Sequence, residues 1–158
     1  MSFLDEAPHI ICLTEHHLKE QEIEITHIPK YKLGAKYCRL KLKNGGVSIY
    51  IMGTLTYSNI NLRKYSKEQD LEICAIQLYT QENTVIIICL YRAPSGYFGN
   101  FLNLLDKILN SLHKPKTEFI ICGDININYM VISNSKKRLD GLLATYNLIF
   151  QLELLTNQ

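Results

Sequence analysis

The chain has 158 residues, of which 47% are hydrophobic and 20% are charged, and its formal net charge is +2 at pH 7. This length allows one domain with a substantial core, which we take to be residues 1–158. No apolar stretch is long enough to cross a bilayer, and the N-terminus lacks the pattern of a secretory signal. The composition therefore excludes a membrane protein and predicts an intracellular, reducing location, and the near-balanced charge does not by itself require a nucleic acid as partner.

The cysteines do not form the close pairs that are typical of zinc or redox motifs. They are Cys12, Cys38, Cys74, Cys89 and Cys122. Three of them lie within apolar runs, where a reduced cysteine packs as a small hydrophobic residue. We therefore expect buried structural thiols.

Four apolar, β-branched runs bounded by polar or turn residues predict strands. They are residues 9–15, 72–79, 84–91 and 118–124. Between the first two, residues 37–52 alternate polar and apolar side chains around Asn44 and Gly45, a pair that favours the positive φ of a hairpin turn. We expect a hairpin there, and a second hairpin in which the sequence TQEN joins the second and third runs.

Two segments predict helices. Residues 97–112 carry phenylalanine, leucine and isoleucine at three-to-four spacing, the stripe of an amphipathic helix, and residues 137–149 indicate a second helix. Strands with helices at intervals predict an α/β domain with a mixed sheet, or two sheets, and helices packed outside.

Three of the apolar runs end in polar side chains. The first ends at Glu15, the third at Tyr91 followed by Arg92, and the last at Asp124 with Asn126 soon after. Because unalternating apolar strands are typical of the centre of a sheet, we expect these ends to lie together. Carboxylates, a carboxamide and a phenol suit a hard divalent cation and a phosphate. The alternative interpretation is that Glu15 and Asp124 cap helices or close turns.

Basic residues gather between Lys30 and Lys43, interleaved with tyrosines, and again at residues 136–138. We interpret Lys41, Lys43 and Arg92 as candidate contacts to nucleic-acid phosphates. A solvated strand face followed by a loop is the other interpretation of the first cluster.

Together these segments resemble the endonuclease/exonuclease/phosphatase superfamily, and within it the endonuclease domain of non-LTR retrotransposons. The matching segments, in family order, are ICLTEHHL, NGGVSIYI, LYRAPSG with FLNLLDKIL, FIICGDININ and LLATYNLIFQL, and they cover nearly the whole chain. The resemblance implies a four-layer αββα sandwich that cuts phosphodiester bonds with Mg²⁺ or Mn²⁺. For the retrotransposon branch it also implies DNA as the substrate and the nucleus as the place of action.

The same resemblance assigns a role to each residue at the strand ends. Glu15 corresponds to a metal-binding glutamate, and Tyr91 to a tyrosine that hydrogen-bonds the scissile phosphate. Asp124 corresponds to the aspartate that orients or deprotonates the attacking water, and Asn126 to the asparagine that holds the phosphate or that aspartate. We interpret His16, with its neighbour in sequence, as a surface residue at a helix start.

The sequence departs from the family pattern at both ends. Family members begin with a strand that carries a metal-holding asparagine and end with a Ser-Asp-His segment, and no segment here resembles either. We therefore expect a domain that is incomplete at both ends, with weak or absent turnover and with unpaired sheet edges that favour association. Asn128 and Asp140 are candidates to replace the lost ligands.

Three functions stay open at this point. The first is a metal-dependent DNA endonuclease, and the second is a catalytically inactive remnant that binds nucleic acid or a protein partner. The third is a sugar- or lipid-phosphate phosphodiesterase on the same fold. The segments NGGVSIYI and YRAPSG favour the retrotransposon type over the third function.

Overall fold

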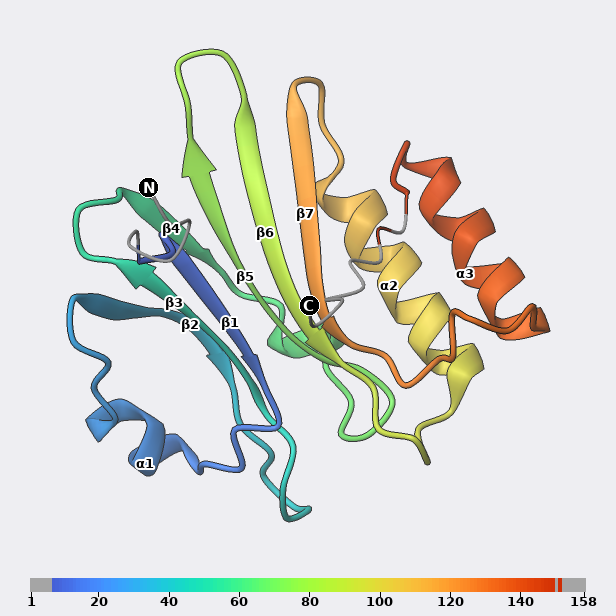
Figure 1. Cartoon of the computed structure of the whole chain (residues 1–158), viewed down its shortest axis with the longest axis horizontal. Coiled ribbons are helices and arrows are strands. Elements are labelled where there is room, and N and C mark those ends of the chain that lie inside the picture. Colours follow the sequence, from blue (N-terminus) through green and yellow to red (C-terminus); the bar gives the residue numbers. More distant parts are fainter. Residues whose placement is uncertain (1–6, 150, 152–158) are drawn as a thin grey trace, which may run out of the picture.

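The chain forms two β-sheets packed face to face, with helices on the outside (Figure 1). The computed structural model describes residues 7–149 and 151. The three-stranded sheet has the order β1 (Ile10–Thr14), β3 (Val47–Met52) and β2 (Tyr31–Tyr37). The four-stranded sheet has the order β4 (Tyr57–Ile60), β5 (Glu72–Tyr79), β6 (Thr84–Tyr91) and β7 (Thr117–Asp124). The predicted α/β fold of two sheets and outer helices is confirmed.

The helices α2 (Phe98–Leu112) and α3 (Asn134–Thr145) lie together on the outer face of the four-stranded sheet (Figure 1). α2 connects β6 to β7, which are parallel and therefore need a crossover, whereas the other strand pairs of the two sheets are antiparallel. The short helix α1 (Glu20–Ile25) lies beside the three-stranded sheet, on the opposite side of the molecule. Three elements were not predicted from the sequence: α1, β4 and the 3₁₀ turn η1 (Arg63–Tyr65).

Two apolar cores follow from this layering. The core between the sheets contains Ala35, Val47, Ile49, Ile51, Cys74, Ile76, Ile87, Cys89, Tyr91 and Ala93. The core between the four-stranded sheet and the helices includes Ile73, Ile88, Leu90, Phe101, Leu105, Ile108, Leu109, Leu139 and Leu143. Because β5 and β6 contribute alternate side chains to both cores, they are the buried strands around which the domain is built.

The predicted hairpin over residues 37–52 is only partly correct. β2 pairs with β3, but β2 ends at Tyr37, and residues 38–46 form a loop rather than a strand. Asn44 and Gly45 have φ of +64° and +75°, as their sequence predicts. The strand fails because the backbone amides after Arg39 bind a carboxylate instead of a neighbouring strand. The second predicted hairpin, between β5 and β6, is confirmed.

The helix predicted over residues 97–112 is confirmed within one residue, whereas the one predicted over residues 137–149 lies earlier, at α3. α3 begins at Asn134 because the Ser133 hydroxyl caps it, accepting a hydrogen bond from the Lys136 amide at 3.1 Å. It ends before Asn147, whose φ of +57° stops the helix.

The expectation that all three polar-ended strands are central is wrong for β1 and β7. Within the described residues each is the outer strand of its sheet, and β1 belongs to a different sheet from β6. The ends still meet because β1 lies against β6 and β7 across the interface between the sheets.

The thiol prediction holds for Cys38, Cys74 and Cys89, which are buried and free. Cys12 and Cys122 are also free, but each is only half-buried. Among the described residues, no helix has the length and apolar character needed to cross a membrane.

Candidate active site at the strand ends

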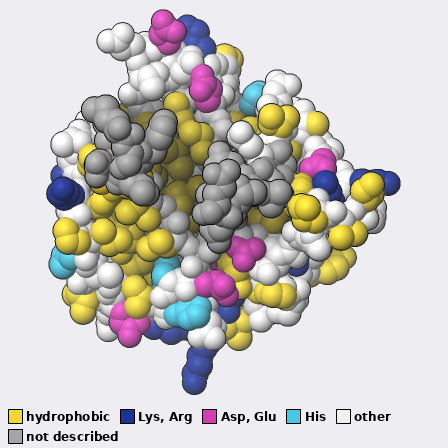
Figure 2. Space-filling model, in the orientation of Figure 1, with side chains coloured by type: hydrophobic (Ala, Val, Ile, Leu, Met, Phe, Trp, Pro, Cys, Tyr) yellow, Lys and Arg dark blue, Asp and Glu magenta, His cyan; other side chains and the backbone are white. Residues whose placement is uncertain are grey.

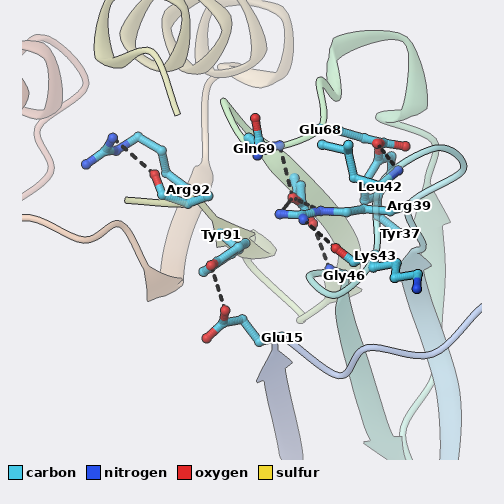
Figure 3. A network of polar contacts seen from close by, with 12 residues as sticks. Glu15, Tyr37, Arg39, Leu42, Lys43, Gly46, Glu68, Gln69, Tyr91 and Arg92 are labelled. Atoms are coloured by element: carbon cyan, nitrogen blue, oxygen red, sulfur yellow. Dashed lines mark hydrogen bonds and ion pairs between the residues drawn. The ribbon is translucent and has the colours of Figure 1, made fainter. Parts of the chain in front are cut away.

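Tyr91 and Glu15 join the two sheets at the point where β6 and β1 end. The Tyr91 hydroxyl donates a hydrogen bond of 2.6 Å to Oε1 of Glu15 (Figure 3). The Tyr91 side chain is only 3% exposed, whereas Glu15, which follows β1 with φ of +52°, is exposed. Burial, and then the hydrogen bond to Glu15, raise the pKa of Tyr91 to about 12. The phenol is therefore protonated at neutral pH and acts as a hydrogen-bond donor.

Asp124 ends β7 directly beside Tyr91, its register partner on β6. The residue before it, Gly123, has φ of +139°, and a Cβ atom there would lie 1.8 Å from the Leu90 carbonyl oxygen. Only glycine lets β7 approach β6 this closely. Oδ1 of Asp124 accepts a hydrogen bond of 2.9 Å from the Asn126 amide, and the carboxylate is exposed, so Oδ2 faces solvent rather than any described donor.

Asn126 and Arg92 fix the loop that follows β7. Nδ2 of Asn126 donates to the Arg92 carbonyl at 2.8 Å, and the Arg92 guanidinium donates to the carbonyls of Ile125, Asn126 and Gly96 at 2.9, 3.0 and 2.8 Å. Arg92 is 6% exposed. Its guanidinium therefore serves to brace two loops, and a contact between Arg92 and nucleic acid stays a prediction.

A second, closed network surrounds Glu72, the register partner of Tyr91 on β5. Its partners Arg39, Gly46 and Gln69 are labelled in Figure 3. The Glu72 carboxylate is fully buried and accepts hydrogen bonds of 2.6 Å from Nε of Arg39, 2.6 Å from the Gly46 amide and 3.1 Å from the Gln69 amide. Nη2 of Arg39 is 2.5 Å from the same carboxylate. This network was not predicted from the sequence, although a glutamate at the start of an apolar strand indicates a buried charge that needs a cation.

The loop 38–46 is held rigidly beside this network. The Glu68 carboxylate accepts hydrogen bonds from the amides of Leu40, Lys41 and Leu42 at 2.6, 2.9 and 2.8 Å. Burial of Glu68 acts against its ionised form, but these amide hydrogen bonds outweigh it and lower the pKa of the carboxyl. The loop leaves the side chains of Lys41 and Lys43 exposed to solvent.

His16 is half-buried, so its interpretation as a surface residue is wrong, whereas the neighbouring His17 is exposed. Nδ1 of His16 accepts a hydrogen bond from the Leu18 amide at 3.0 Å, which leaves the proton on Nε2, 3.2 Å from the Tyr37 carbonyl. Burial lowers the pKa of the ring. Both nitrogens of the neutral ring are thus occupied, and neither is free to bind a metal ion.

Asn128 and Asp140, the candidates to replace the lost ligands, form hydrogen bonds with residues of their own segment. Oδ1 of Asn128 accepts a hydrogen bond from the Met130 amide at 3.0 Å, and Oδ1 of Asp140 accepts one from the Tyr129 hydroxyl at 3.2 Å. Acidic and histidine side chains gather in Figure 2 where β1 and β7 end. Even so, residues 7–149 and 151 contain no group of three or more histidine, cysteine, aspartate or glutamate side chains placed to hold a metal ion.

Comparison with known proteins supports this architecture. No protein-family model matches the sequence, and no curated protein matches it. Among solved structures, the endonuclease domain of TRAS1, a telomere-specific non-LTR retrotransposon, is similar with a TM-score of 0.65 and 12% identity, over 87% of this chain and 59% of that chain.

Two structures of D. rerio TDP2 are also similar. The form humanized by 14 mutations has a TM-score of 0.52 and 11% identity, over 77% of this chain and 50% of that chain. The complex with a single-strand DNA product has a TM-score of 0.50 and 12% identity, over 89% of this chain and 52% of that chain. The chain thus spans between 50% and 59% of the length of these structures, and across that length it shares their fold.

Proposed function

We propose that this chain hydrolyses phosphodiester bonds in DNA, as a divalent-metal-dependent endonuclease of the retrotransposon type. The observation that carries the proposal is the hydrogen bond between Tyr91 and Glu15, which joins the two sheets beside the exposed carboxylate of Asp124. A phenol donor, a carboxylate that accepts its hydrogen bond and a second, open carboxylate are groups that hydrolytic attack on a phosphate can use.

Mg²⁺ or Mn²⁺ fits this site only as an ion that is shared with the substrate. One oxygen of Glu15 binds the Tyr91 hydroxyl, and the carboxylate is otherwise exposed. Mg²⁺ keeps several waters and takes one or two protein carboxylates together with substrate phosphate oxygens. Glu15 would hold it, and the bound ion would neutralise the negative charge that develops on the phosphate. An ion fully enclosed by protein ligands does not fit the described residues.

The side chains of the chain itself supply the remaining steps. Oδ2 of Asp124 accepts the proton of the attacking water, while the bond from the Asn126 amide holds Oδ1 in place. The protonated Tyr91 hydroxyl turns from Glu15 to a phosphate oxygen and stabilises its charge. Asn126 is oriented for the same purpose by its hydrogen bond to the Arg92 carbonyl.

The exposed lysines supply the proposed contacts to DNA. Lys41 and Lys43 are exposed on the loop 38–46, whose backbone is held by Glu68, so a phosphate backbone bound there would meet positive charges on an ordered loop. A chain that acts on chromosomal DNA would work in the nucleus, and that location is part of the proposal.

The test is nicking of supercoiled plasmid in the presence of Mg²⁺ or Mn²⁺. We expect weak, metal-dependent nicking by the wild-type chain and a loss of about 10²-fold or more in Glu15→Gln and in Asp124→Asn, because each substitution removes one acting carboxylate. Glu82→Gln is the matched control, because Glu82 is exposed in the turn between β5 and β6, far from the strand ends. This variant should nick at the wild-type rate. Equal nicking by all four chains would refute the assigned site.

A second candidate function is binding without hydrolysis. The observation that favours it is the lack, among the described residues, of a three-ligand group for a metal ion. The same plasmid experiment separates the two functions when it is analysed by gel shift. Retarded plasmid without metal-dependent nicking supports a binding remnant, whereas nicking that depends on Glu15 and Asp124 excludes it.

A further inference from the structure

Two leucines lie exposed on the loop 38–46. The side chain of Leu40 is 69% exposed and that of Leu42 is 40% exposed, and neither belongs to one of the two apolar cores. A single exposed leucine is common on protein surfaces, but apolar side chains that are grouped on one loop are typical of a surface that binds a partner. Lys41 lies between the two leucines and Lys43 follows them, so apolar and positively charged side chains alternate along this exposed stretch.

The hydrogen bonds of this loop hold its backbone in place without burying the leucines. In addition to the amide bonds that Glu68 accepts, Nζ of Lys19 donates hydrogen bonds of 3.1 Å to the carbonyls of Arg39 and Leu42. Nη1 of Arg39 donates a hydrogen bond of 2.9 Å to the Lys43 carbonyl. Because the backbone is ordered before any partner binds, the entropic cost of presenting these side chains to a partner is small.

The end of the loop is joined to the candidate active site. The Gly45 carbonyl accepts a hydrogen bond of 2.9 Å from the amide of His17, which lies two residues after Glu15. The next amide, that of Gly46, donates to the buried Glu72 carboxylate. Figure 1 shows the loop extending beyond the point where β1 ends. A polymer that is bound at Glu15 can therefore reach this loop as well.

The charge on the loop favours an anionic partner. Lys41 and Lys43 are exposed, and neither forms an ion pair with a described residue. The carboxylates beside the loop are already bound, that of Glu68 by loop amides and that of Glu72 by Arg39. Nucleic acid offers phosphates to the lysines and base faces to the leucines. An anionic membrane surface would also attract the lysines, but the position of the loop next to the candidate site for phosphodiester hydrolysis favours DNA.

We propose that Leu40 and Leu42 form an apolar wedge that enters a groove of duplex DNA and packs against partly unstacked bases. Lys41 and Lys43 bind the phosphates beside these bases. The wedge rests on the proposed endonuclease function, and it adds that the substrate is a duplex that the protein distorts. Pyrimidine–purine steps unstack most readily, so binding should favour sites that contain them.

The wild-type chain is titrated, without added metal, into a duplex oligonucleotide that carries 2-aminopurine at a TA step. We expect binding, measured by fluorescence anisotropy of a labelled strand, together with the rise in 2-aminopurine fluorescence that accompanies unstacking. Leu40→Ser combined with Leu42→Ser should abolish this rise and weaken binding about 10-fold. Both leucines are exposed, so these substitutions leave the cores intact. Ile25→Ser is the matched control, because it removes a 76% exposed aliphatic side chain from α1 and should behave as the wild type does.

The salt dependence of binding separates the two kinds of side chain. Lys41→Gln combined with Lys43→Gln should lower the slope of log affinity against log salt concentration by about 2, because about one counterion is released for each phosphate contact. The double leucine variant should keep the wild-type slope, since its lost contacts are apolar. An equal change of slope in both variants would contradict the division of roles between leucines and lysines.

Three results would overturn the wedge, and they are distinguishable. Wild-type affinity and a full fluorescence rise in the double leucine variant would remove the wedge but leave the proposed function standing. No binding of the duplex by the wild-type chain would remove both. Leucine-dependent binding to vesicles of phosphatidylserine and phosphatidylcholine, without unstacking of the duplex, would assign the loop to a membrane surface instead.

Discussion

Two carboxylate sites flank Tyr91, and they differ in how completely the protein satisfies them. On one side, Glu72 is fully buried and receives hydrogen bonds from Arg39, Gly46 and Gln69. On the other side, Glu15 is exposed, and among the described residues it receives a hydrogen bond from Tyr91 alone. Figure 3 labels Tyr91 with Glu15, and it labels the partners of Glu72, which are Arg39, Gly46 and Gln69. A glutamate carboxylate is thus enclosed by protein at position 72 and open to solvent at position 15.

This difference indicates which carboxylate stabilises the fold and which is available to a ligand. A buried charge is tolerated only when a counter-ion and hydrogen-bond donors occupy its oxygens, and such a group has no lone pairs left for a substrate. An exposed carboxylate with an open oxygen adds little to stability but can bind a cation or accept a proton. On this basis we infer that Glu72 stabilises the fold, whereas Glu15 is available to bind a ligand in the candidate active site.

The largest expected effect comes from the same substitution made on the two sides. Glu72→Gln leaves the buried Arg39 guanidinium without its counter-ion and should lower the free energy of unfolding by about 3–5 kcal/mol. Glu15→Gln changes an exposed side chain and should lower it by about 0.5 kcal/mol or less. Urea denaturation followed by circular dichroism measures both. Equal losses in the two variants would remove the distinction between the sites.

Near the exposed carboxylate of Asp124, the packing of β7 on β6 requires a glycine at position 123. Gly123→Ala places a Cβ atom 1.8 Å from the Leu90 carbonyl oxygen at a φ that alanine rarely adopts. It should therefore cost about 1–3 kcal/mol of stability. Gly141→Ala is the matched control, because Gly141 lies within α3 with no atom near its Cβ position and should gain about 0.5–1 kcal/mol. An unchanged free energy of unfolding in Gly123→Ala would mean that β7 packs less tightly on β6.

The smallest expected effect is a pH dependence at the boundary between the two sites. Burial lowers the pKa of His16 from its ordinary value of 6.5, so the unfolded chain binds more protons there than the folded chain does. Stability contributed by the neutral ring is complete above that value and declines as the pH falls below it. In His16→Asn the unfolding free energy should fall less between about pH 7 and about pH 5. His17→Asn, which alters an exposed ring, should keep the wild-type slope.

Sequence patterns predicted the parts of this fold that depend on local periodicity. The apolar runs of β5, β6 and β7 and the stripe of α2 follow from side-chain spacing alone, and the polar residues at the strand ends marked the candidate site. The resemblance to a known family assigned roles to Glu15 and Asp124, but local patterns could not show that β1 belongs to a second sheet. That arrangement depends on pairing with β3, far away in the sequence.

The missed features depend on long-range contacts. Arg39 lies in a segment whose alternation predicts a strand, yet it turns inward because Glu72, on another sheet, needs a cation. Glu68 then takes the amides that would have formed the strand. The His16 ring likewise bonds the Leu18 amide and the carbonyl of Tyr37, which is 21 residues away in the sequence. Charged residues that break a local pattern are thus the signal to search for a buried partner.

Tyr91→Phe tests the central claim most directly, because the Tyr91 hydroxyl is the contact between the fold and the open carboxylate. The substitution keeps the ring in the core and removes only the donor, so it should cost about 0.5–1.5 kcal/mol of stability. At equal fractions of folded protein, we predict that metal-dependent plasmid nicking falls about 100-fold relative to the wild type. Nicking at the wild-type rate by Tyr91→Phe would contradict the account.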